Sequence, residues 1–394
     1  MAHDSGMNFS AQTNFLGERD AIISLSFLTT NKLRFPVAAA KVYAKYETEY
    51  TSWVQNGRLH VVGLDLRDLC EVERFCAFVK ERFGRVDAII NNACQTVRRP
   101  ANYYKEQVNK EAEREPVFQE CLGACDVFEA AREARDAGRT IGMGATTGKI
   151  EADEAPEGAK GTVVVKDGGG GGGGGESNAK ISKSAAMSLM PLTSEDMSTP
   201  SSLLPSGLHD INGQQLDMRR HNSWLLTLPQ VSTPEIIECM YINVISPFVM
   251  NSRLLPLMVA PPTAATSPSA SASPASSPPR FIINVSAMEG KFYRYKTPNH
   301  PHTNMAKAAL NMMTRTSSES LASQGIYMNS VDTGWINDEN PVEIAGRTAV
   351  NNNFQTPIDE IDAAARVLDP IFSALQGGEL LYGKFLKDFR DSEW

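Results

Sequence analysis

Short apolar runs alternate with longer stretches of helical spacing along the first hundred residues. Residues 21–28 (AIISLSFL) and 58–66 (RLHVVGLDL) are rich in β-branched and apolar side chains, which is typical of strands. Residues 37–54 and 71–82 repeat their apolar positions every three or four residues, as a helix with one buried face does. A further strand is predicted at 85–93 (RVDAIINNA), so the pattern predicts an α/β fold with a doubly wound parallel sheet.

The second half contains a strand that is apolar on both faces. Residues 280–286 (RFIINVS) have the composition of a strand buried inside a parallel sheet, and they end on Ser286. A turn rich in Gly, Pro and Asn leads from this strand into an alanine-rich helix that is predicted to extend to about residue 323. Parallel sheets hold ligands beside the carboxyl ends of their strands, so chemistry is expected close to Ser286.

Another helix is predicted to begin just before Pro234. Pro234 and Glu235 suit a first helical turn. Thr233 is the expected start, with Ser232 as the competing cap. Pro247 is expected to bend this helix. The remaining predicted elements are a strand entering a loop at 325–335, a helix at 359–375 and a terminal strand at 381–389.

Low-complexity stretches interrupt these elements in two places. Residues 168–175 are eight consecutive glycines and residues 181–207 are mostly Ser, Thr, Met and Pro, compositions that do not offset the entropy of ordering. The expected organisation is one Rossmann-like domain whose parts are a flexible N-terminus at 1–19, an N-terminal part at 20–100, a largely disordered insertion at 101–216, and a C-terminal part at 217–394 with a disordered loop at 260–279.

The glycine-rich turn that opens a Rossmann domain is not found before residue 57. Gly6 and Gly17 are isolated, and neither follows an apolar strand. One helix and one strand fit between residues 21–28 and Asp65, which favours 21–28 as the second strand of the sheet. The domain would then be incomplete at its N-terminal βα unit. The alternative places 21–28 first, followed by a loop without glycine.

Charge and composition narrow the function classes. The net charge is −8 and no long Lys/Arg cluster is present, so nucleic-acid and anionic-membrane binding are not expected. Residues 142–149 (GMGATTGK) depart from a P-loop in the spacing of their glycines and in the isoleucine that follows the lysine. No signal peptide or long apolar run is present, so a soluble cytoplasmic protein is expected. The 6 cysteines are scattered, and His300 and His302 lack a third ligand, so no metal site is expected.

Four stretches, in this order, resemble the short-chain dehydrogenase/reductase family. They are residues 86–94 (VDAIINNAC), the helix with Asn243, the strand ending at Ser286 with the following Lys307 helix, and residues 329–335 (NSVDTGW). The resemblance covers most of the chain outside the insertions. It implies an oxidoreductase that acts on an alcohol or carbonyl group of a small-molecule substrate, with NAD or NADP as cofactor. A homo-oligomer is compatible with it.

The resemblance also assigns catalytic positions. In this family a serine orients the substrate oxygen, a tyrosine is the acid or base, a lysine four residues later lowers the pKa of the tyrosine and holds the nicotinamide ribose, and an asparagine steadies a proton-relay water. Ser286, Lys307 and Asn243 take the places of the serine, the lysine and the asparagine. Thr303 stands at the tyrosine position, and its hydroxyl ionises too weakly to replace a phenol.

Further positions resemble the cofactor contacts of the family. They are Asp65, Asn91, Asn92, Ala93, Lys307, Gly334 and Ile336. Asp65 corresponds to the acidic residue that meets the adenine ring, and a helix cap is the competing interpretation. Cys94 replaces a glycine after the NNA stretch, and Thr333 replaces a proline of the nicotinamide loop. Lys32 and Arg34 either meet an NADP 2′-phosphate or remain solvated.

These departures from the family pattern leave alternatives open. Tyr293, Tyr295, His300 or His302 could supply the proton, with His302 the best titrator near pH 7; otherwise all four are loop residues without a role. The missing glycine turn predicts weak or absent cofactor binding by the chain as written. The alternative function is a catalytically inactive protein of this fold that serves as an interaction scaffold. An incomplete gene product is a third hypothesis.

Overall fold

The computed structural model describes residues 62, 64–106, 108, 187–210, 215–259, 278–293, 295–353 and 356–394. The elements predicted at 21–28 and 37–54 lie outside these residues, as do the N-terminus, Lys32, Arg34, the oligoglycine tract and most of 260–279. Residues 62 and 64–66, the described part of the strand predicted at 58–66, are not in a strand. A turn follows them instead and leads into the first described helix.

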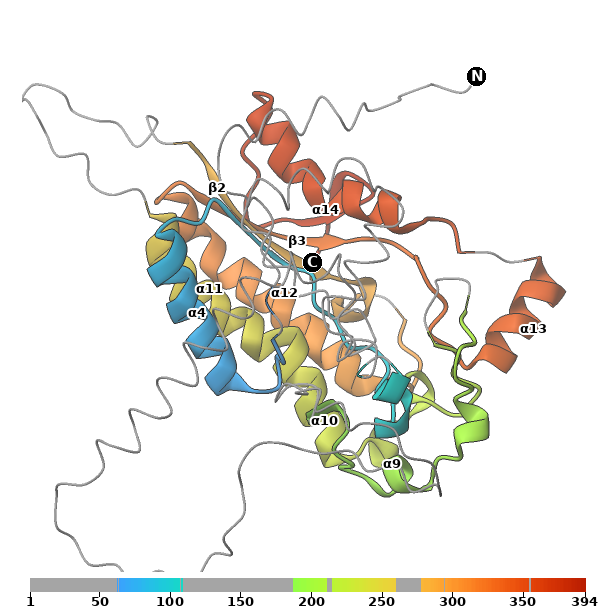
Figure 1. Cartoon of the computed structure of the whole chain (residues 1–394). Coiled ribbons are helices and arrows are strands. Elements are labelled where there is room, and N and C mark those ends of the chain that lie inside the picture. Colours follow the sequence, from blue (N-terminus) through green and yellow to red (C-terminus); the bar gives the residue numbers. More distant parts are fainter. Residues whose placement is uncertain are drawn as a thin grey trace, which may run out of the picture.

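Five strands form one sheet at the centre of the described structure (Figure 1). They are β1 (Ala88–Asn91), β2 (Arg280–Ser286), β3 (Ile326–Asp332), β4 (Phe385–Lys387) and β5 (Arg390–Ser392), adjacent in that order. The pairs β1 with β2, β2 with β3 and β3 with β4 are parallel. The predicted α/β fold with a parallel sheet is therefore confirmed.

The end of the chain differs from its prediction. The single strand predicted at 381–389 is a short antiparallel hairpin of β4 and β5. Asp388 and Phe389 take positive φ values of 49° and 63°, the backbone conformation of a tight hairpin turn, so the chain reverses direction there. Sequence periodicity missed the reversal because neither turn residue is a glycine.

Helices cover both faces of the sheet, so every residue of β2 is buried. Phe281, Ile283 and Val285 of β2 pack with α14 (Glu360–Leu375) on one face. Ile282 faces the opposite layer, formed by α4 (Leu69–Phe83), α11 (Ser246–Met258) and α12 (Pro301–Ala322). Figure 1 shows α14 on one side of β2 and β3 and the other three helices on the other side. Helix α13 (Val342–Asn352) has no buried residues.

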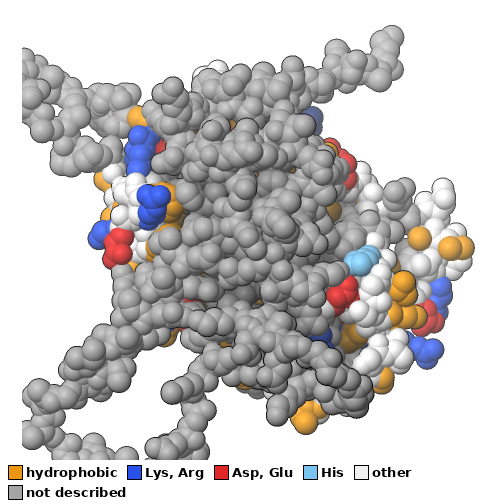
Figure 2. All heavy atoms as spheres, in the orientation of Figure 1, with side chains coloured by type: hydrophobic (Ala, Val, Ile, Leu, Met, Phe, Trp, Pro, Cys, Tyr) orange, Lys and Arg blue, Asp and Glu red, His pale blue; other side chains and the backbone are white. Residues whose placement is uncertain are grey.

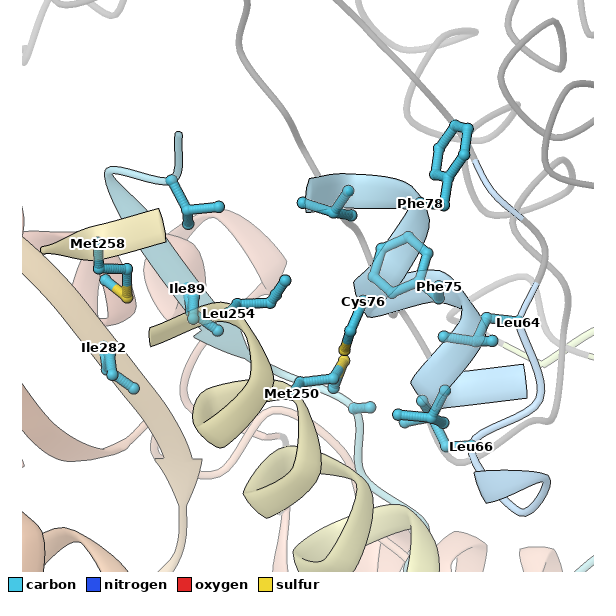
Figure 3. Packing of buried hydrophobic residues seen from close by; sticks show 14 of the residues in the cluster. Leu64, Leu66, Phe75, Cys76, Phe78, Ile89, Met250, Leu254, Met258 and Ile282 are labelled. Carbon is cyan, nitrogen blue, oxygen red and sulfur yellow. The ribbon is translucent and has the colours of Figure 1, made fainter. Parts of the chain in front are cut away.

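The larger part of the core lies where α4 packs on α11. Phe75 and Cys76 of α4 face Met250 of α11, and Leu254 continues this contact toward Ile89 of β1 (Figure 3). The helix predicted at 71–82 is confirmed, and it begins two residues earlier because the Asp68 side chain accepts hydrogen bonds from the N–H groups of its first turn.

The helix predicted from residue 233 consists of three joined pieces. In α10 (Thr233–Met240) the cap is Ser232, whose hydroxyl accepts from the Glu235 N–H at 3.3 Å, so the competing cap is the correct one. A π-helical segment, η6 (Tyr241–Ile245), then leads into α11. The helix is distorted just before Pro247, close to where the bend is expected. Pro247 has no N–H to donate, and the N–H of Ser246 bonds Tyr241 O, five residues back.

Part of the segment expected to be disordered is folded. Residues 194–198 form α9 (Ser194–Ser198), capped reciprocally by Thr193 and Asp196. Residues 101–104 form a short 3₁₀ helix, η2 (Ala101–Tyr104), with both tyrosines buried. Large apolar side chains remain exposed around α9, among them Met190, Met197 and Leu208, and hydrophobic groups are visible in this region at the lower right of Figure 2. The expectation of disorder is thus wrong for residues 187–210.

A buried ion pair attaches α9 to the loop after β1. Arg98 donates from Nη1 to Asp196 Oδ1 at 2.9 Å and from Nη2 to Asp196 Oδ2 at 2.6 Å, and the two side chains are 5% and 0% exposed. Burial alone would raise the pKa of Asp196, but hydrogen bonds from Arg98 and from two backbone N–H groups lower it to about 2. Composition gave no sign of this pair because its members are 98 residues apart.

The ion pair belongs to a larger charge network. Glu238 of α10 lies between two arginines, accepting from Arg67 Nη1 at 3.1 Å and standing 3.3 Å from Arg98 Nε. Arg219 donates to Asp217 from Nε at 3.0 Å and from Nη2 at 2.8 Å, and it also reaches Glu195. Opposite charges surround each guanidinium, which offsets the cost of burying it.

Among the described residues, no helix has the length and apolar character needed to cross a membrane.

We predict that Asp196→Asn destabilises the protein by about 3 kcal/mol, because it leaves Arg98 buried without its counter-ion. Chemical unfolding at pH 7 measures this difference. The difference in stability between wild type and Asp196→Asn should decline as the pH falls from about 4 through the folded-state pKa of about 2, because protonation of the wild-type Asp196 removes the same charge. Glu73→Gln, which breaks the exposed Glu73–Arg253 pair, is the matched control and should leave the midpoint unchanged. Equal midpoints for wild type and Asp196→Asn would contradict the prediction.

Candidate functional site

The candidate site lies at the carboxyl end of β2. Ser286 is the last residue of this strand, and it pairs in register with Asp332, the last residue of β3. Asn91 ends β1 on the other side of β2. Polar side chains therefore end three adjacent parallel strands at one edge of the sheet, the position where open α/β sheets bind ligands.

Helix α12 contacts the end of β2 through two side chains. Lys307 is 2% exposed, and its Nζ donates to Val285 O at 2.9 Å, next to Ser286. The Ser286 hydroxyl donates to Asn311 Oδ1 at 2.6 Å. Asn311 follows Lys307 by one helical turn, so both side chains lie on the same face of α12. The structure thus places Lys307 at the end of β2, next to Ser286.

Gly290 allows the loop after β2 to lie against α12. A Cβ atom at this position would be 2.6 Å from the Lys307 carbonyl carbon and 2.7 Å from Asn311 Nδ2. Because real Cβ atoms do not approach backbone this closely, only glycine fits here. The close approach fixes the loop that continues from Ser286 relative to Lys307 and Asn311.

Asn243 lies within the π-helical segment η6 and is 1% exposed. Its Nδ2 donates to Gln95 O at 3.1 Å and to Cys239 O at 2.9 Å. Within the described ranges its Oδ1 has no hydrogen-bond partner. Buried acceptors are seldom left unsatisfied in native proteins, so this oxygen is available to a water or a bound hydroxyl. A π-helical turn at a buried polar residue is a frequent feature of functional sites.

The Cys239 thiol is buried in contact with Asn243 and near Thr303. Burial raises the pKa of the Cys239 thiol to about 12, while Lys307 and the Thr303 hydroxyl oppose this rise, so both groups are near the sulfur. Thr303 is 1% exposed, and its hydroxyl makes no hydrogen bond of standard geometry to the described residues. We regard the contact with the thiol as weak, because sulfur is a poor acceptor.

The four residues that could replace the missing phenol lie in different environments. Tyr295 is 90% exposed, and Tyr293 is half exposed with its ring over the Lys291 ammonium. His300 caps α12 with a positive φ of 41°, stacks on Trp224 and bonds the Trp224 carbonyl through Nδ1. His302 alone among the four is fully buried.

His302 is held in its neutral form. Its Nε2 is 3.7 Å from Glu235 Oε1, and its Nδ1 has no partner among the described residues. Burial, assisted by His300, lowers the pKa of His302 to about 4, and burial raises the pKa of Glu235. At neutral pH His302 is uncharged, so His302 and Glu235 do not form an ion pair despite their short separation. Burial makes the Glu235 carboxyl harder to ionise.

The three residues of the NNA stretch, 91–93, lie in different environments. Asn91 is buried, and its Nδ2 donates to Asn251 Oδ1 at 2.9 Å and to Asn284 Oδ1 at 2.7 Å, which links β1 to β2 and α11. The Asn92 N–H turns back to Ile90 O at 3.1 Å, and Ala93 is 4% exposed. Asn91 therefore connects β1 to β2 and α11.

Asp65 has a partner within its own loop. Its carboxylate accepts from Arg67 Nη2 at 2.6 Å and from the Arg67 N–H at 2.9 Å, so it does not face an open space as a free acceptor. It is not a helix cap either, because Asp68 caps α4. Gly334, with a φ of 89°, donates its N–H to Asp332 Oδ1 at 2.7 Å, and Ile336 is half-buried two residues further on. These two lie near the same edge of the sheet as Ser286.

Sequence reasoning missed Asn311, Cys239, Glu235 and Gln95 as members of this site. Asn311 had a signal in the sequence, since polar residues recur at helical spacing along the buried face of α12. They are Thr303, Lys307, Asn311, Thr314 and Ser318, and all are buried. The part of the chain that the structure describes contains no group of three His, Cys, Asp or Glu side chains suited to a metal ion.

Comparison with known proteins gives partial matches. The sequence matches no protein-family model. Over 167 residues it is 34% identical to an uncharacterized protein of Acanthamoeba polyphaga mimivirus, covering 41% of this chain and 32% of that protein. The chain thus spans about a third of the length of the curated relative that it matches.

Solved structures match at low identity. A short-chain dehydrogenase from Streptomyces avermitilis is 13% identical over 90% of this chain and 75% of that chain, with a TM-score of 0.40. The carbonyl reductase Sniffer of D. melanogaster is 21% identical over 43% and 61%, with a TM-score of 0.32. The NADPH-bound carbonyl reductase from chicken fatty liver is 17% identical over 45% and 62%, with a TM-score of 0.30.

We predict that Gly290→Ala destabilises the protein by about 1–3 kcal/mol, because the added methyl group overlaps the Lys307 backbone. Gly346→Ala is the matched control. Gly346 is exposed within α13 with open space around it, so alanine there should stabilise by up to about 1 kcal/mol. Thermal unfolding should therefore shift in opposite directions for the two variants, and shifts of the same sign would contradict the close approach at Gly290.

A second prediction concerns pH. His302 has a pKa of 6.5 in an unfolded chain and about 4 here, so the unfolded state binds the extra proton between these values. The contribution of His302 to the free energy of unfolding is fully present above about pH 6.5, and it falls by about 2 kcal/mol between there and pH 5. His302→Gln should remove this part of the decline, as measured by denaturant unfolding at pH 7 and pH 5. Exposed His221→Gln is the control, and a decline in His302→Gln equal to that of wild type would disprove the assignment.

Proposed function

We propose that the protein is an NAD(P)-dependent oxidoreductase of the short-chain dehydrogenase/reductase type that acts on the alcohol or carbonyl group of a small molecule. The observation that supports this proposal is that Ser286, Lys307 and Asn243 are three buried polar residues from a strand, a helix and a π-helical turn. Ser286 and Lys307 lie at the carboxyl end of β2, and Asn243 bonds Gln95 O in the loop after β1.

The residues present fit the nicotinamide end of such a cofactor. Among the described residues Lys307 gives one N–H to Val285 O, which leaves the other two ammonium protons for ribose hydroxyls. Asn243 Oδ1 is a buried acceptor that the described residues leave open. The adenine end fits less well, because Arg67 already engages the Asp65 carboxylate. When bound, the cofactor would accept or supply the hydride.

A proton must move at the substrate oxygen while the hydride moves at carbon. Thr303 is unsuited to this, because an aliphatic hydroxyl ionises too weakly. His302 is the better candidate of the residues near it, since it is buried, adjacent in sequence to Thr303 and beside Glu235. Burial raises the pKa of the Glu235 carboxyl, which lies 3.7 Å from the imidazole, so these two titratable groups are the ones that could exchange a proton here.

An inactive scaffold is the second candidate, and one observation favours it. The hydrogen bond from Lys307 to Val285 O attaches α12 to the end of β2, so the lysine can have a purely structural role. A threonine at position 303, where the family has tyrosine, is consistent with a protein that has lost catalytic activity. The exposed apolar side chains around α9 would then be the surface that contacts a partner.

Restoring the phenol is the most direct test of the proposal. Thr303 is fully buried against Cys239, so we combine Thr303→Tyr with Cys239→Ala to make room. The Lys307 ammonium should lower the pKa of the new phenol, and carbonyl-dependent NADPH oxidation should rise about 10²-fold or more over wild type. Thr303→Phe with Cys239→Ala is the matched control, because it adds the same ring without the hydroxyl.

Lys307 provides the complementary measurement. Lys307→Met should abolish the gained activity and weaken binding of NADPH in calorimetric titration, whereas Lys80→Met, at an exposed site on α4, should change neither. Identical oxidation traces for the tyrosine, phenylalanine and methionine variants, with no heat of cofactor binding, would favour the scaffold.

A further inference from the structure

Lys291 is a buried lysine whose ammonium group faces aromatic rings. It is 1% exposed, and its Nζ lies 4.2 Å from the centre of the Phe385 ring and 4.8 Å from the centre of the Tyr293 ring. Its Nζ also donates to Ser392 Oγ at 2.8 Å. Among the described residues these three groups, and no carboxylate, surround the ammonium. Two aromatic faces and a hydroxyl thus take the place of a counter-ion, and such contacts are strong when the cation is removed from water.

This contact joins the loop after β2 to the C-terminal hairpin. Phe385 and Ser392 belong to β4 and β5, and they pair across the hairpin. Phe385 is fully buried, and its ring centre is 6.0 Å from that of Trp394. The hairpin also contacts the end of β3, because Lys387 Nζ donates to Asp332 Oδ2 at 3.0 Å. One hairpin therefore holds both the loop after β2 and the end of β3.

Lys291 directly follows the close approach at Gly290. The N–H groups of Gly290 and Lys291 each bond a carbonyl three residues back, at 3.0 and 3.1 Å, so residues 287–291 form one tight turn. This turn has no room to move toward α12, because a Cβ on Gly290 would already lie 2.6 Å from the Lys307 carbonyl carbon. Displacement in another direction would pull the Lys291 ammonium off its aromatic faces, which is unfavourable.

We propose that the C-terminal hairpin is a clasp that positions the candidate site, and that Lys291 is the positioning residue through which it acts. The clasp keeps residues 287–291 against the backbone of Lys307, at the end of β2. Its effect on cofactor binding rests on the proposed function, in which Lys307 donates to ribose hydroxyls. The hold of the hairpin on the loop does not depend on that function.

Hydrogen exchange in the full chain tests the clasp without any ligand. Lys291→Met keeps the length of the side chain and removes its charge, and a desolvated contact between a cation and an aromatic ring is worth more than a tenfold change in an equilibrium constant. Amide exchange within residues 287–291 should therefore become at least about tenfold faster. Lys384→Met is the matched control, because it breaks the exposed Lys384–Asp391 ion pair of the same hairpin. Equal exchange in wild type and Lys291→Met would overturn the proposal.

A second variant distinguishes loss of the clasp from a general loss of stability. Ser392→Asp places a carboxylate beside the Lys291 ammonium. Its effect on the melting temperature should be more favourable in wild type than in the Lys291→Met background, where the carboxylate has no ammonium beside it. The same change in melting temperature in both backgrounds would contradict the clasp.

Calorimetric titration with NADPH tests the consequence for the site. Lys291→Met should weaken NADPH binding by about tenfold or more, because a smaller fraction of the molecules has the loop in place, whereas Lys384→Met should leave binding unchanged. Unchanged binding in Lys291→Met would overturn the positioning role. If wild type binds neither NADPH nor NADH, the oxidoreductase proposal fails, and the exchange rates of residues 287–291 alone decide whether the clasp exists.

Discussion

A polar stripe on the buried face of α12 sets the arrangement of the central strands. Lys307, Asn311 and Thr314 are all enclosed, and burying such groups without partners would cost several kcal/mol in total. Each has a partner on the sheet. Lys307 bonds Val285 O and Asn311 accepts from Ser286, while Thr314 accepts from Asn284 Nδ2 at 2.9 Å and from Ser330 Oγ at 2.8 Å. A shift of the helix by one residue would break all of these bonds together, so the polar groups specify one position of α12 along β2 and β3.

The same requirement continues across the sheet. Asn284 accepts from Asn91 of β1 and donates to Thr314 of α12, so its side chain connects two layers of the structure. Parallel strands alone could slide relative to one another, because their apolar side chains are similar in size and have no direction. Directional amide hydrogen bonds at Asn91 and Asn284 remove that freedom at the end of the strands where the candidate site lies. The geometry of the site is therefore a consequence of how the core satisfies its buried polar groups.

Sequence reasoning was successful where one local signal decided the structure. Apolar runs and helical spacing located β2, β3, α4 and α14. It was unsuccessful where contacts between residues far apart in the chain determine the structure. Arg98 and Asp196 are 98 positions apart, and their ion pair orders a Ser, Thr and Met-rich segment whose own composition predicts disorder. Asn311 lay between these cases, because its helical spacing from Lys307 was visible in the sequence while its hydrogen bond to Ser286 was not.

Several hydrogen-bond donors of the candidate site are already bonded within the protein, and this limits the chemistry that the site can perform. Ser286 gives its proton to Asn311, both amide protons of Asn243 go to backbone carbonyls, and Lys307 uses one N–H on Val285 O. What remains for a bound molecule, among these three residues, is the rest of the Lys307 ammonium together with acceptor oxygens on Ser286 and Asn243. A molecule that fits this set must offer hydroxyl donors, as the ribose of a nicotinamide cofactor and an alcohol both do. Loss of the phenol at position 303 removes the group that would exchange a proton with such a hydroxyl, so binding at this site is less dependent on residue 303 than turnover is.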